Sequence, residues 1–254
     1  MANSLERIRT LLLGIFLIMT PVGIVLMLSG VPAKAYLWTT SIYLGVEAVL
    51  TLTLLLKAST PLRAMAATAL LILVSIVIEF TGVTTGYPFG SYYYSYYLSP
   101  FIVGNVPLAI SFAWFVIVVN AFLLIRTQLP KISTLRSSLF TGGLVLSIDI
   151  LLEPFAAFIN SYWRWTNNLI PFRNYASWFL LGVFFSLLID RILVTVREDE
   201  KSAALRFSGI LLGVNIGQFV LINLVHGYVL QTLAGSLLLA VTLWMVQRRR
   251  AHAL

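Results

Sequence analysis

The stretch VPLAISFAWFVIVVNAFLLI, residues 106–125, carries no charged side chain along its whole length. An α-helix needs about 20 predominantly apolar residues to cross the hydrocarbon core of a bilayer, so this segment is long enough by itself. The rest of the chain is similar, since 59% of its 254 residues are hydrophobic and only 10% are charged. A soluble domain carries about 25% charged residues. The composition therefore predicts a protein whose solvent is mostly the membrane.

Eight apolar segments of this kind predict an all-α fold, a polytopic transmembrane helical bundle that forms one integral-membrane domain over residues 1–254. The expected spans are 10–29, 36–56, 64–80, 106–125, 139–158, 175–196, 206–224 and 228–246. Because only a short turn near His226 and Gly227 separates the last two, a seven-span arrangement stays open. We expect the first segment to be retained, since its apolar core is longer than the roughly 7–15 residues of a signal peptide.

The basic residues favour eight spans over seven, with both termini in the cytoplasm. In that topology only three of the 17 Lys and Arg residues, Lys34, Arg164 and Arg173, lie in outer loops, and cytoplasmic loops are enriched in basic residues. Seven spans would place the arginines at 248–250 outside. The positive charge lies at the ends of apolar segments, which indicates contact with lipid headgroups and no nucleic-acid partner. We therefore expect a multi-pass protein of the cytoplasmic membrane.

Two outer loops have a composition that is unusual for simple connections. The first, residues 79–107, holds five tyrosines within six positions: Tyr92, Tyr93, Tyr94, Tyr96 and Tyr97. Together with its glycines and prolines, this favours a structured, lid-like loop over a plain interfacial belt of aromatic residues. The second loop contains Trp163, Arg164 and Trp165, and the arginine is expected either to stack on the tryptophans or to bind lipid phosphate. Both loops lie on one face of the membrane, so we expect them to roof a cavity between the helices.

Five of the nine acidic residues fall within or at the ends of spans: Glu47, Glu79, Asp149, Glu153 and Asp190. Acidic groups are costly there and usually face a cavity or a partner, so each is a functional candidate. The direction of the spans places Glu79, Asp149 and Glu153 in the outer half, beneath the two loops. Asp190 lies near the cytoplasmic end beside Arg191, where we expect a solvated or paired structural role. For Glu47, a packing hydrogen bond and a functional role stay equally open.

Asp149 and Glu153 are four residues apart and therefore share one face of a helix, and Pro154 is expected to bend the helix directly after them. Clustered carboxyl groups cannot all ionise in a cavity of low dielectric constant, so at least one should stay protonated at neutral pH. A protonated carboxylic acid can donate its proton to an electron-rich alkene. Aromatic faces would stabilise the resulting carbocation, and a dry pocket would control what attacks it.

The residue types that are missing exclude several other chemistries. The chain has no cysteine and only two histidines, His226 and His252, so thiolate chemistry and the histidine clusters of di-iron or zinc sites are excluded. No glycine-rich dinucleotide motif or P-loop is present, and the four lysines lie in loops, where they cannot form a retinal Schiff base within a span. We therefore expect no metal and no cofactor. What remains is acid–base chemistry on an apolar substrate, or no chemistry.

Two blocks of residues between 79 and 178 stand out together. The first block runs from Glu79 through segments 80–82, 85–90 and 92–94 to Asn105 and Trp114, and the second contains Asp149, Glu153, Pro154, Trp163, Trp165, Asn174 and Trp178. In this order they resemble the integral-membrane carotenoid hydratase family, of the bisanhydrobacterioruberin hydratase and carotenoid 1,2-hydratase type. The resemblance covers about two fifths of the chain, and its first block is the more specific.

The resemblance implies addition of water to the terminal C=C bond of an acyclic carotenoid end group, without a redox cofactor, in carotenoid biosynthesis. We expect Asp149 or Glu153 to be the acid, and Glu79 to be its partner or the base that orients water. Substrate-binding residues are expected as well. The end-group pocket is expected to be lined by Tyr92, Tyr94, Trp114, Trp163 and Trp165. The water is expected to be held by Asn105 and Asn174. The carotenoid and membrane lipids are the expected partners, while a homo-oligomer or an association with other carotenoid enzymes stays open.

Two other functions also stay open. A carotenoid end-group cyclase begins with the same protonation but closes a ring, so its product gains no mass, whereas hydration adds one water. A proton-coupled transporter or a lipid-binding protein would also place acids within the membrane. Many transporters are built from internal repeats, and the sequence contains no detectable repeat of this kind.

Overall fold

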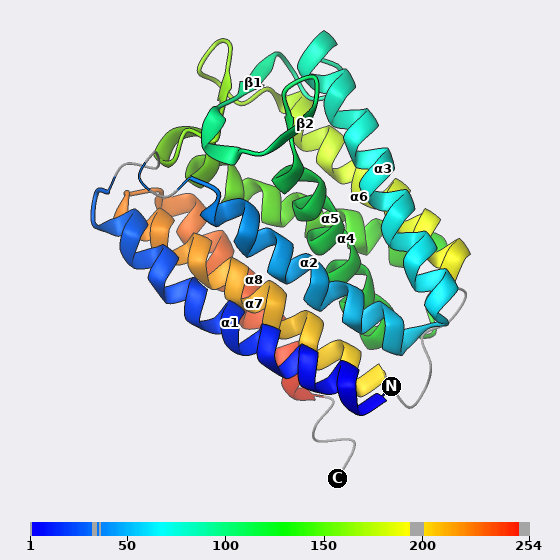
Figure 1. Ribbon diagram of the computed structural model, residues 1–254. Helices are drawn as coiled ribbons and strands as arrows, with labels where there is room; N and C mark the ends of the chain where they lie inside the picture. The colour runs from blue at the N-terminus through cyan, green and yellow to red at the C-terminus, as the bar shows by residue number, and fades with distance from the viewer. Residues whose placement is uncertain (1, 32–34, 36, 194–200, 249–254) are drawn as a thin grey trace.

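Eight long α-helices build the protein in the computed structural model, which describes all residues except 1, 32–34, 36, 194–200 and 249–254 (Figure 1). The helices are α1 (Ala2–Leu28), α2 (Thr39–Ala58), α3 (Pro61–Thr85), α4 (Leu108–Gln128), α5 (Thr134–Glu153), α6 (Phe172–Leu193), α7 (Lys201–Val225) and α8 (Val229–Arg248). Each is long and apolar enough to cross a membrane. The chain is therefore a multi-pass membrane protein, and the prediction of eight spans rather than seven is confirmed.

Helix α4 lies at the centre of the bundle, and 89% of its most apolar window is buried. Its apolar residues face every direction, which is the pattern of a helix enclosed by other helices. By contrast, only 6% of the corresponding window in α1 and 17% in α8 is buried. These two helices present leucines, valines and isoleucines to the outside. In a bilayer such faces lie against lipid chains, so the buried site must be sought around α4.

Helices α5 and α6 approach each other closely because glycines lie between them. A Cβ atom at Gly142 would lie 2.7 Å from the carbonyl oxygen of Phe179, and one at Gly182 would lie 3.0 Å from the Cα of Gly142. Small residues at helix interfaces in membranes allow such close backbone contact. This packing fixes the position of Asp149 and Glu153 on α5 relative to Asn174 on α6.

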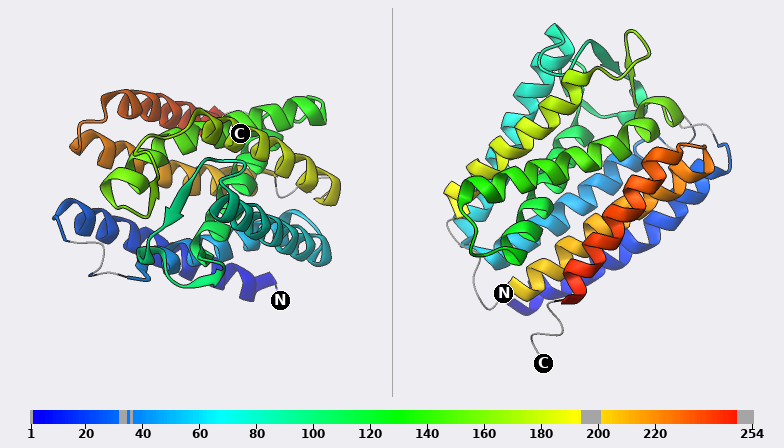
Figure 2. Two further views of the ribbon diagram at one scale, coloured as in Figure 1. Left: turned by 90° about the horizontal axis from the view of Figure 1, so that it is seen from above. Right: turned by 180° about the vertical axis from the view of Figure 1, so that it is seen from behind.

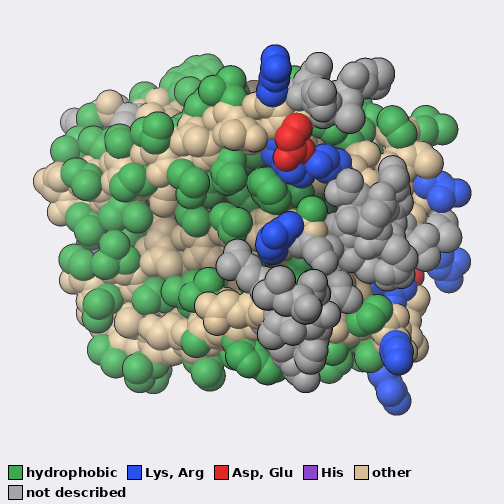
Figure 3. Space-filling view, turned by 90° about the horizontal axis from the view of Figure 1, so that it is seen from below, with side chains coloured by type: hydrophobic (Ala, Val, Ile, Leu, Met, Phe, Trp, Pro, Cys, Tyr) green, Lys and Arg blue, Asp and Glu red, His purple; other side chains and the backbone are tan. Residues whose placement is uncertain are grey.

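The start of α1 and the end of α8 lie at the same end of the bundle (Figures 1 and 2), as an even number of spans requires. Lys and Arg side chains gather on that end, as the view from below shows (Figure 3). Lys57, Arg63, Arg126 and Arg136 all lie close to helix ends on this side of the bundle. This agrees with the predicted charge distribution, while the cytoplasmic location of this end stays a prediction. Lys34, Arg249, Arg250 and His252 lie outside the described residues.

The two aromatic loops pair with each other over the opposite end of the bundle (Figure 1). Strand β1 (Tyr92–Tyr94) runs antiparallel to β4 (Trp163–Trp165), with Tyr92 opposite Trp165 and Tyr94 opposite Trp163. The first loop also contains a 3₁₀ turn, Tyr96–Leu98, and a second small ladder of β2 (Phe101–Val103) with β3 (Val106–Pro107). The loop is therefore structured, although the all-α prediction did not include these strands.

Two local features differ from the sequence predictions. Helix α3 continues to Thr85, where Gly86 with φ of 74° ends it, so Glu79 lies inside the helix rather than at its end; glycine adopts this left-handed conformation without strain. Of the two alternatives left open for Arg164, stacking between the tryptophans is not found among the described residues. Neighbouring residues of a strand point to opposite faces, and Arg164 is exposed while Trp163 and Trp165 are buried.

Candidate active site

Glu79 on α3 is a buried carboxyl group that accepts three hydrogen bonds from neutral donors. The hydroxyls of Tyr92 and Tyr94 each donate to Oε2 at 2.7 Å, and Nε1 of Trp114 donates to Oε1 at 2.7 Å. Gly82, one turn further along α3, makes room for this arrangement, because a Cβ atom there would lie 2.6 Å from the Tyr92 hydroxyl. Both oxygens of Glu79 are thus held in place by side chains from β1 and α4.

Glu153 at the end of α5 is bound in the same way by the second loop. Nε1 of Trp163 and Nε1 of Trp165 donate to its Oε2 at 3.3 and 3.0 Å. Nδ2 of Asn174 donates to its Oε1 at 2.9 Å and also to Oδ2 of Asp149 at 3.1 Å. Asn174 therefore bridges the two acids, which lie one helical turn apart on α5. The π-helical turn Pro154–Ile159 follows directly, so Pro154 marks the point where the regular α-helix ends.

The ladder of β1 and β4 explains why the donors converge. Side chains two residues apart in a strand point to the same face, so Tyr92 and Tyr94 face the helices together, as do Trp163 and Trp165. The residues between them, Tyr93 and Arg164, point outward and are exposed. One face of this small ladder thus supplies both tyrosines to Glu79 and both tryptophans to Glu153.

Glu79, Asp149 and Glu153, which we call the carboxyl cluster, have no cationic partner among the described residues. Each is at most 3% exposed. Burial raises the pKa of the Tyr92 phenol above its ordinary value, and the nearby Glu79 raises it further, so Tyr92 stays protonated and donates. Buried acids that meet only neutral donors are unusual, since buried charges are normally paired, and this makes the cluster a candidate functional site.

A cavity of about 210 Å³ lies between the helices beneath the paired loops, and Glu79 and Glu153 both line it. Its walls are mainly aromatic and aliphatic, and Trp114 and Trp178 stack there with ring centroids 4.1 Å apart. The cavity therefore has room for more than a single water molecule, which needs at least about 10–15 Å³ measured in this way. Asp149 does not line it and reaches it only through Asn174.

Comparison with known proteins agrees with this geometry. Residues 38–242 match the family described as "Carotenoid biosynthesis protein". This chain belongs to that family. It is also 36% identical over 133 residues to a protein named bisanhydrobacterioruberin hydratase from Haloarcula japonica, a match that covers 50% of this chain and 45% of that relative. The chain thus spans less than half of the relative's length. No solved structure matches it.

The structure brings together all but one of the residues that the sequence predicted for the site. The described contacts unite the carboxyl cluster with Tyr92, Tyr94, Trp114, Trp163, Trp165 and Asn174. Asn105 is the exception. It lies exposed in the turn between β2 and β3 with φ of 67°, a conformation that asparagine tolerates better than most residues. Its position corrects the expectation that it holds water in the site.

Three further cavity residues were not predicted as site residues: Phe89 and Tyr162 line the cavity from the loops, and Asn215 lines it from α7. Glu47, whose role the sequence left open, lines it from α2. The only sequence signal for Glu47 was a carboxyl group in the middle of a span. Nothing in the sequence connected it with Asn215, which lies 168 positions away. Within the described residues, no group of three or more His, Cys, Asp or Glu side chains is placed to hold a metal ion.

Proposed function

We propose that this membrane protein is a cofactor-independent hydratase that adds water to the terminal C=C bond of an acyclic carotenoid end group. The observation that carries the proposal is the cavity in which two buried carboxyl groups, each bound by neutral donors, meet aromatic walls. Proton donors, a weakly polar space and aromatic faces are what alkene protonation requires. The name of the relative that matches half of this chain supports the same reaction class.

In the proposed reaction, Glu153 delivers the proton, because it lines the cavity while Asp149 lies behind Asn174. The π electrons of the alkene form the new C–H bond and leave a tertiary carbocation on the neighbouring carbon. Asp149, whose Oδ1 has no hydrogen-bond partner among the described residues, shares the proton of the pair with Glu153. Such coupled acids titrate as a unit.

Glu79 provides the opposite charge in this proposal. The proposal assigns the carboxylate form to Glu79, whose two oxygens accept three hydrogen bonds, and a carboxylate at the cavity wall stabilises the carbocation. A water oxygen then bonds to the cationic carbon, and its surplus proton passes to Glu79. That proton returns to the Asp149–Glu153 pair before the next turnover, so the enzyme is regenerated without a cofactor.

The test is expression of the chain in cells that accumulate an acyclic carotenoid, followed by mass spectrometry of the pigment. We expect a gain of one water per modified end, with the oxygen derived from labelled water, and activity that survives metal chelation and anaerobic conditions. An isomer of unchanged mass would identify a cyclase, and label from molecular oxygen would identify a hydroxylase. If purified protein leaves the carotenoid unchanged, a transport or lipid-binding role replaces the proposal.

A further inference from the structure

A second polar cluster lines the same cavity on a different wall. Glu47 on α2 is fully buried, and Nδ2 of Asn215 on α7 donates to its Oε1 at 2.6 Å. The hydroxyl of Tyr43 donates to Oδ1 of Asn215 at 3.2 Å and lies 3.3 Å from Oγ1 of Thr20 on α1. All four residues line the cavity, as does Gln218. This Glu47 cluster is built from α1, α2 and α7, whereas the carboxyl cluster is built from α3 and α5.

One oxygen of Glu47 distinguishes it from the other acids that line the cavity. Its Oε2 is buried and has no hydrogen-bond partner among the residues that the structure describes. Glu79 and Glu153 have donors on both oxygens. A buried polar atom without a partner is costly, and a polar cavity of sufficient size satisfies it with a water that has two to four partners. Tyr43 and Asn215 supply polar atoms beside Glu47 for such a water.

We propose that Glu47, Tyr43 and Asn215 bind the water molecule that captures the carbocation. The inference rests on the proposed hydratase function and deepens it. Much of the remaining cavity wall is apolar or aromatic, so water needs a polar group to hold it there. Placement of this group on another wall than Glu153 lets the proton and the water oxygen reach adjacent carbons of the alkene from different directions.

This role separates the two halves of the reaction. Glu153 gives its proton to one alkene carbon, and the water held at Glu47 gives an electron pair to the other while its surplus proton passes to Glu79. When no water is held nearby, the carbocation instead returns a proton to the carboxylate and becomes an alkene again. In deuterium oxide this return leaves deuterium in the recovered carotenoid. Deuterium exchange therefore reports protonation, and hydrated product reports water capture.

The experiment compares wild-type protein with Glu47→Leu and Glu47→Gln in membranes supplied with an acyclic carotenoid in deuterium oxide. We expect Glu47→Leu to lower hydrated product about tenfold or more, since it removes a hydrogen bond to a polar anchor, while deuterium still enters the recovered substrate. Glu47→Gln keeps donor and acceptor atoms that hold water, so hydration should stay within about threefold of wild type.

Asn120→Leu is the matched control, because Asn120 is also fully buried with an unpartnered oxygen but does not line the cavity. It should leave the ratio of hydration to exchange unchanged. A Glu47→Gln variant as inactive as Glu47→Leu would make Glu47 a proton-transfer residue and overturn the proposal. An equal loss of hydration and exchange in Glu47→Leu, or no loss at all, would overturn it as well.

Two further outcomes separate this inference from the function on which it rests. A Glu47→Leu variant that hydrates normally but is less inhibited by the alcohol product would show that the Glu47 cluster binds the hydroxyl group of the product. That result would contradict the proposal. Wild-type protein that neither hydrates nor exchanges the carotenoid would refute the hydratase function and this inference together.

Discussion

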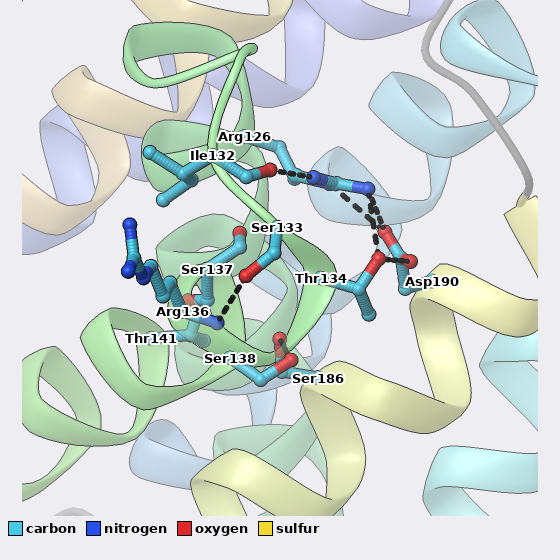
Figure 4. Close-up of polar contacts among 10 residues, drawn as sticks. All are labelled: Arg126, Ile132, Ser133, Thr134, Arg136, Ser137, Ser138, Thr141, Ser186 and Asp190. Atoms are coloured by element: carbon cyan, nitrogen blue, oxygen red, sulfur yellow. Dashed lines mark hydrogen bonds and ion pairs between the residues drawn. The ribbon is translucent and has the colours of Figure 1, made fainter.

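Glu153 and Asp190 are both acids near helix ends in the membrane-spanning bundle, yet their partners differ. Asp190, at the opposite end from the paired loops, accepts a hydrogen bond from Nε of Arg126 at 2.9 Å and one from the hydroxyl of Thr134 at 2.8 Å. Figure 4 shows both side chains pointing toward it. Nη2 of Arg126 lies 2.6 Å from the same carboxylate. Glu153 meets only two indoles and an amide.

The difference gives a testable criterion for separating acids that hold helices together from those proposed to take part in the reaction. The guanidinium of Arg126 forms an ion pair with Asp190, and together with Thr134 this pair joins α4, α5 and α6. The neutral donors around Glu153 orient its carboxyl group without supplying a cation. Of the solvated and paired roles that the sequence left open for Asp190, the structure has the paired one, with Arg126 as the partner rather than the adjacent Arg191.

The largest expected effect comes from removing the transferable proton. Glu153→Gln keeps the shape of the side chain and its acceptor oxygen but cannot protonate an alkene, so hydration should fall about 10²–10⁴-fold. Asp190→Asn is the matched control at the other end and should keep near-normal turnover. Hydrated carotenoid would be measured per amount of protein in the membrane. A reversed result, with Asp190→Asn inactive and Glu153→Gln active, would mean that the active site lies at the Asp190 end of the bundle and not beneath the paired loops.

A smaller effect is expected from Asn174→Ala, which removes the amide that bridges Asp149 and Glu153. A hydrogen bond to a charged group contributes about 1.5–3 kcal/mol, which corresponds to a loss of hydration of about 10–100-fold. Asn174→Asp would add a fourth acid and should not restore the rate. Turnover of Asn174→Ala equal to wild type would show that the two acids do not act as a unit.

Trp165→Phe should have a still smaller effect, because Trp163 continues to donate to the same oxygen of Glu153. Loss of one neutral hydrogen bond at about 0.5–1.5 kcal/mol predicts a reduction of about 2–10-fold. The ring and its aromatic face are retained, so the measurement isolates the indole N–H. Trp244→Phe, on the exposed surface of α8, serves as control and should leave the rate unchanged.

Asp190→Asn should change stability rather than catalysis. Both partners of the pair are partly exposed, with side chains 14% and 22% accessible, so the loss should be below the about 3–5 kcal/mol of a fully buried pair. Thermal unfolding of the detergent-solubilised protein should therefore occur at a lower temperature, and Arg126→Gln should lower it similarly. A catalytic defect without any loss of stability would contradict the comparison drawn between the two acids.

The sequence by itself determined the membrane-spanning architecture. Whether a segment spans is a local property, because a helix satisfies its backbone hydrogen bonds within itself and needs only length and apolar side chains. The direction of successive spans then placed Glu79, Asp149 and Glu153 at one end, and their four-residue spacing put the last two on one face. These conclusions needed no knowledge of which helices are neighbours.

Only the tertiary structure decided which residues meet. The ladder joins Tyr92 to Trp165 across 73 positions of sequence, and the contact of Asn215 with Glu47 joins α7 to α2. Asn105 and Asn174 looked equivalent in sequence, yet one lies in an exposed turn and the other bridges two acids. Hydrogen bonds between side chains far apart in the sequence depend on how the helices pack and how the loops pair. The length of the apolar segments carries no information about helix packing or loop pairing.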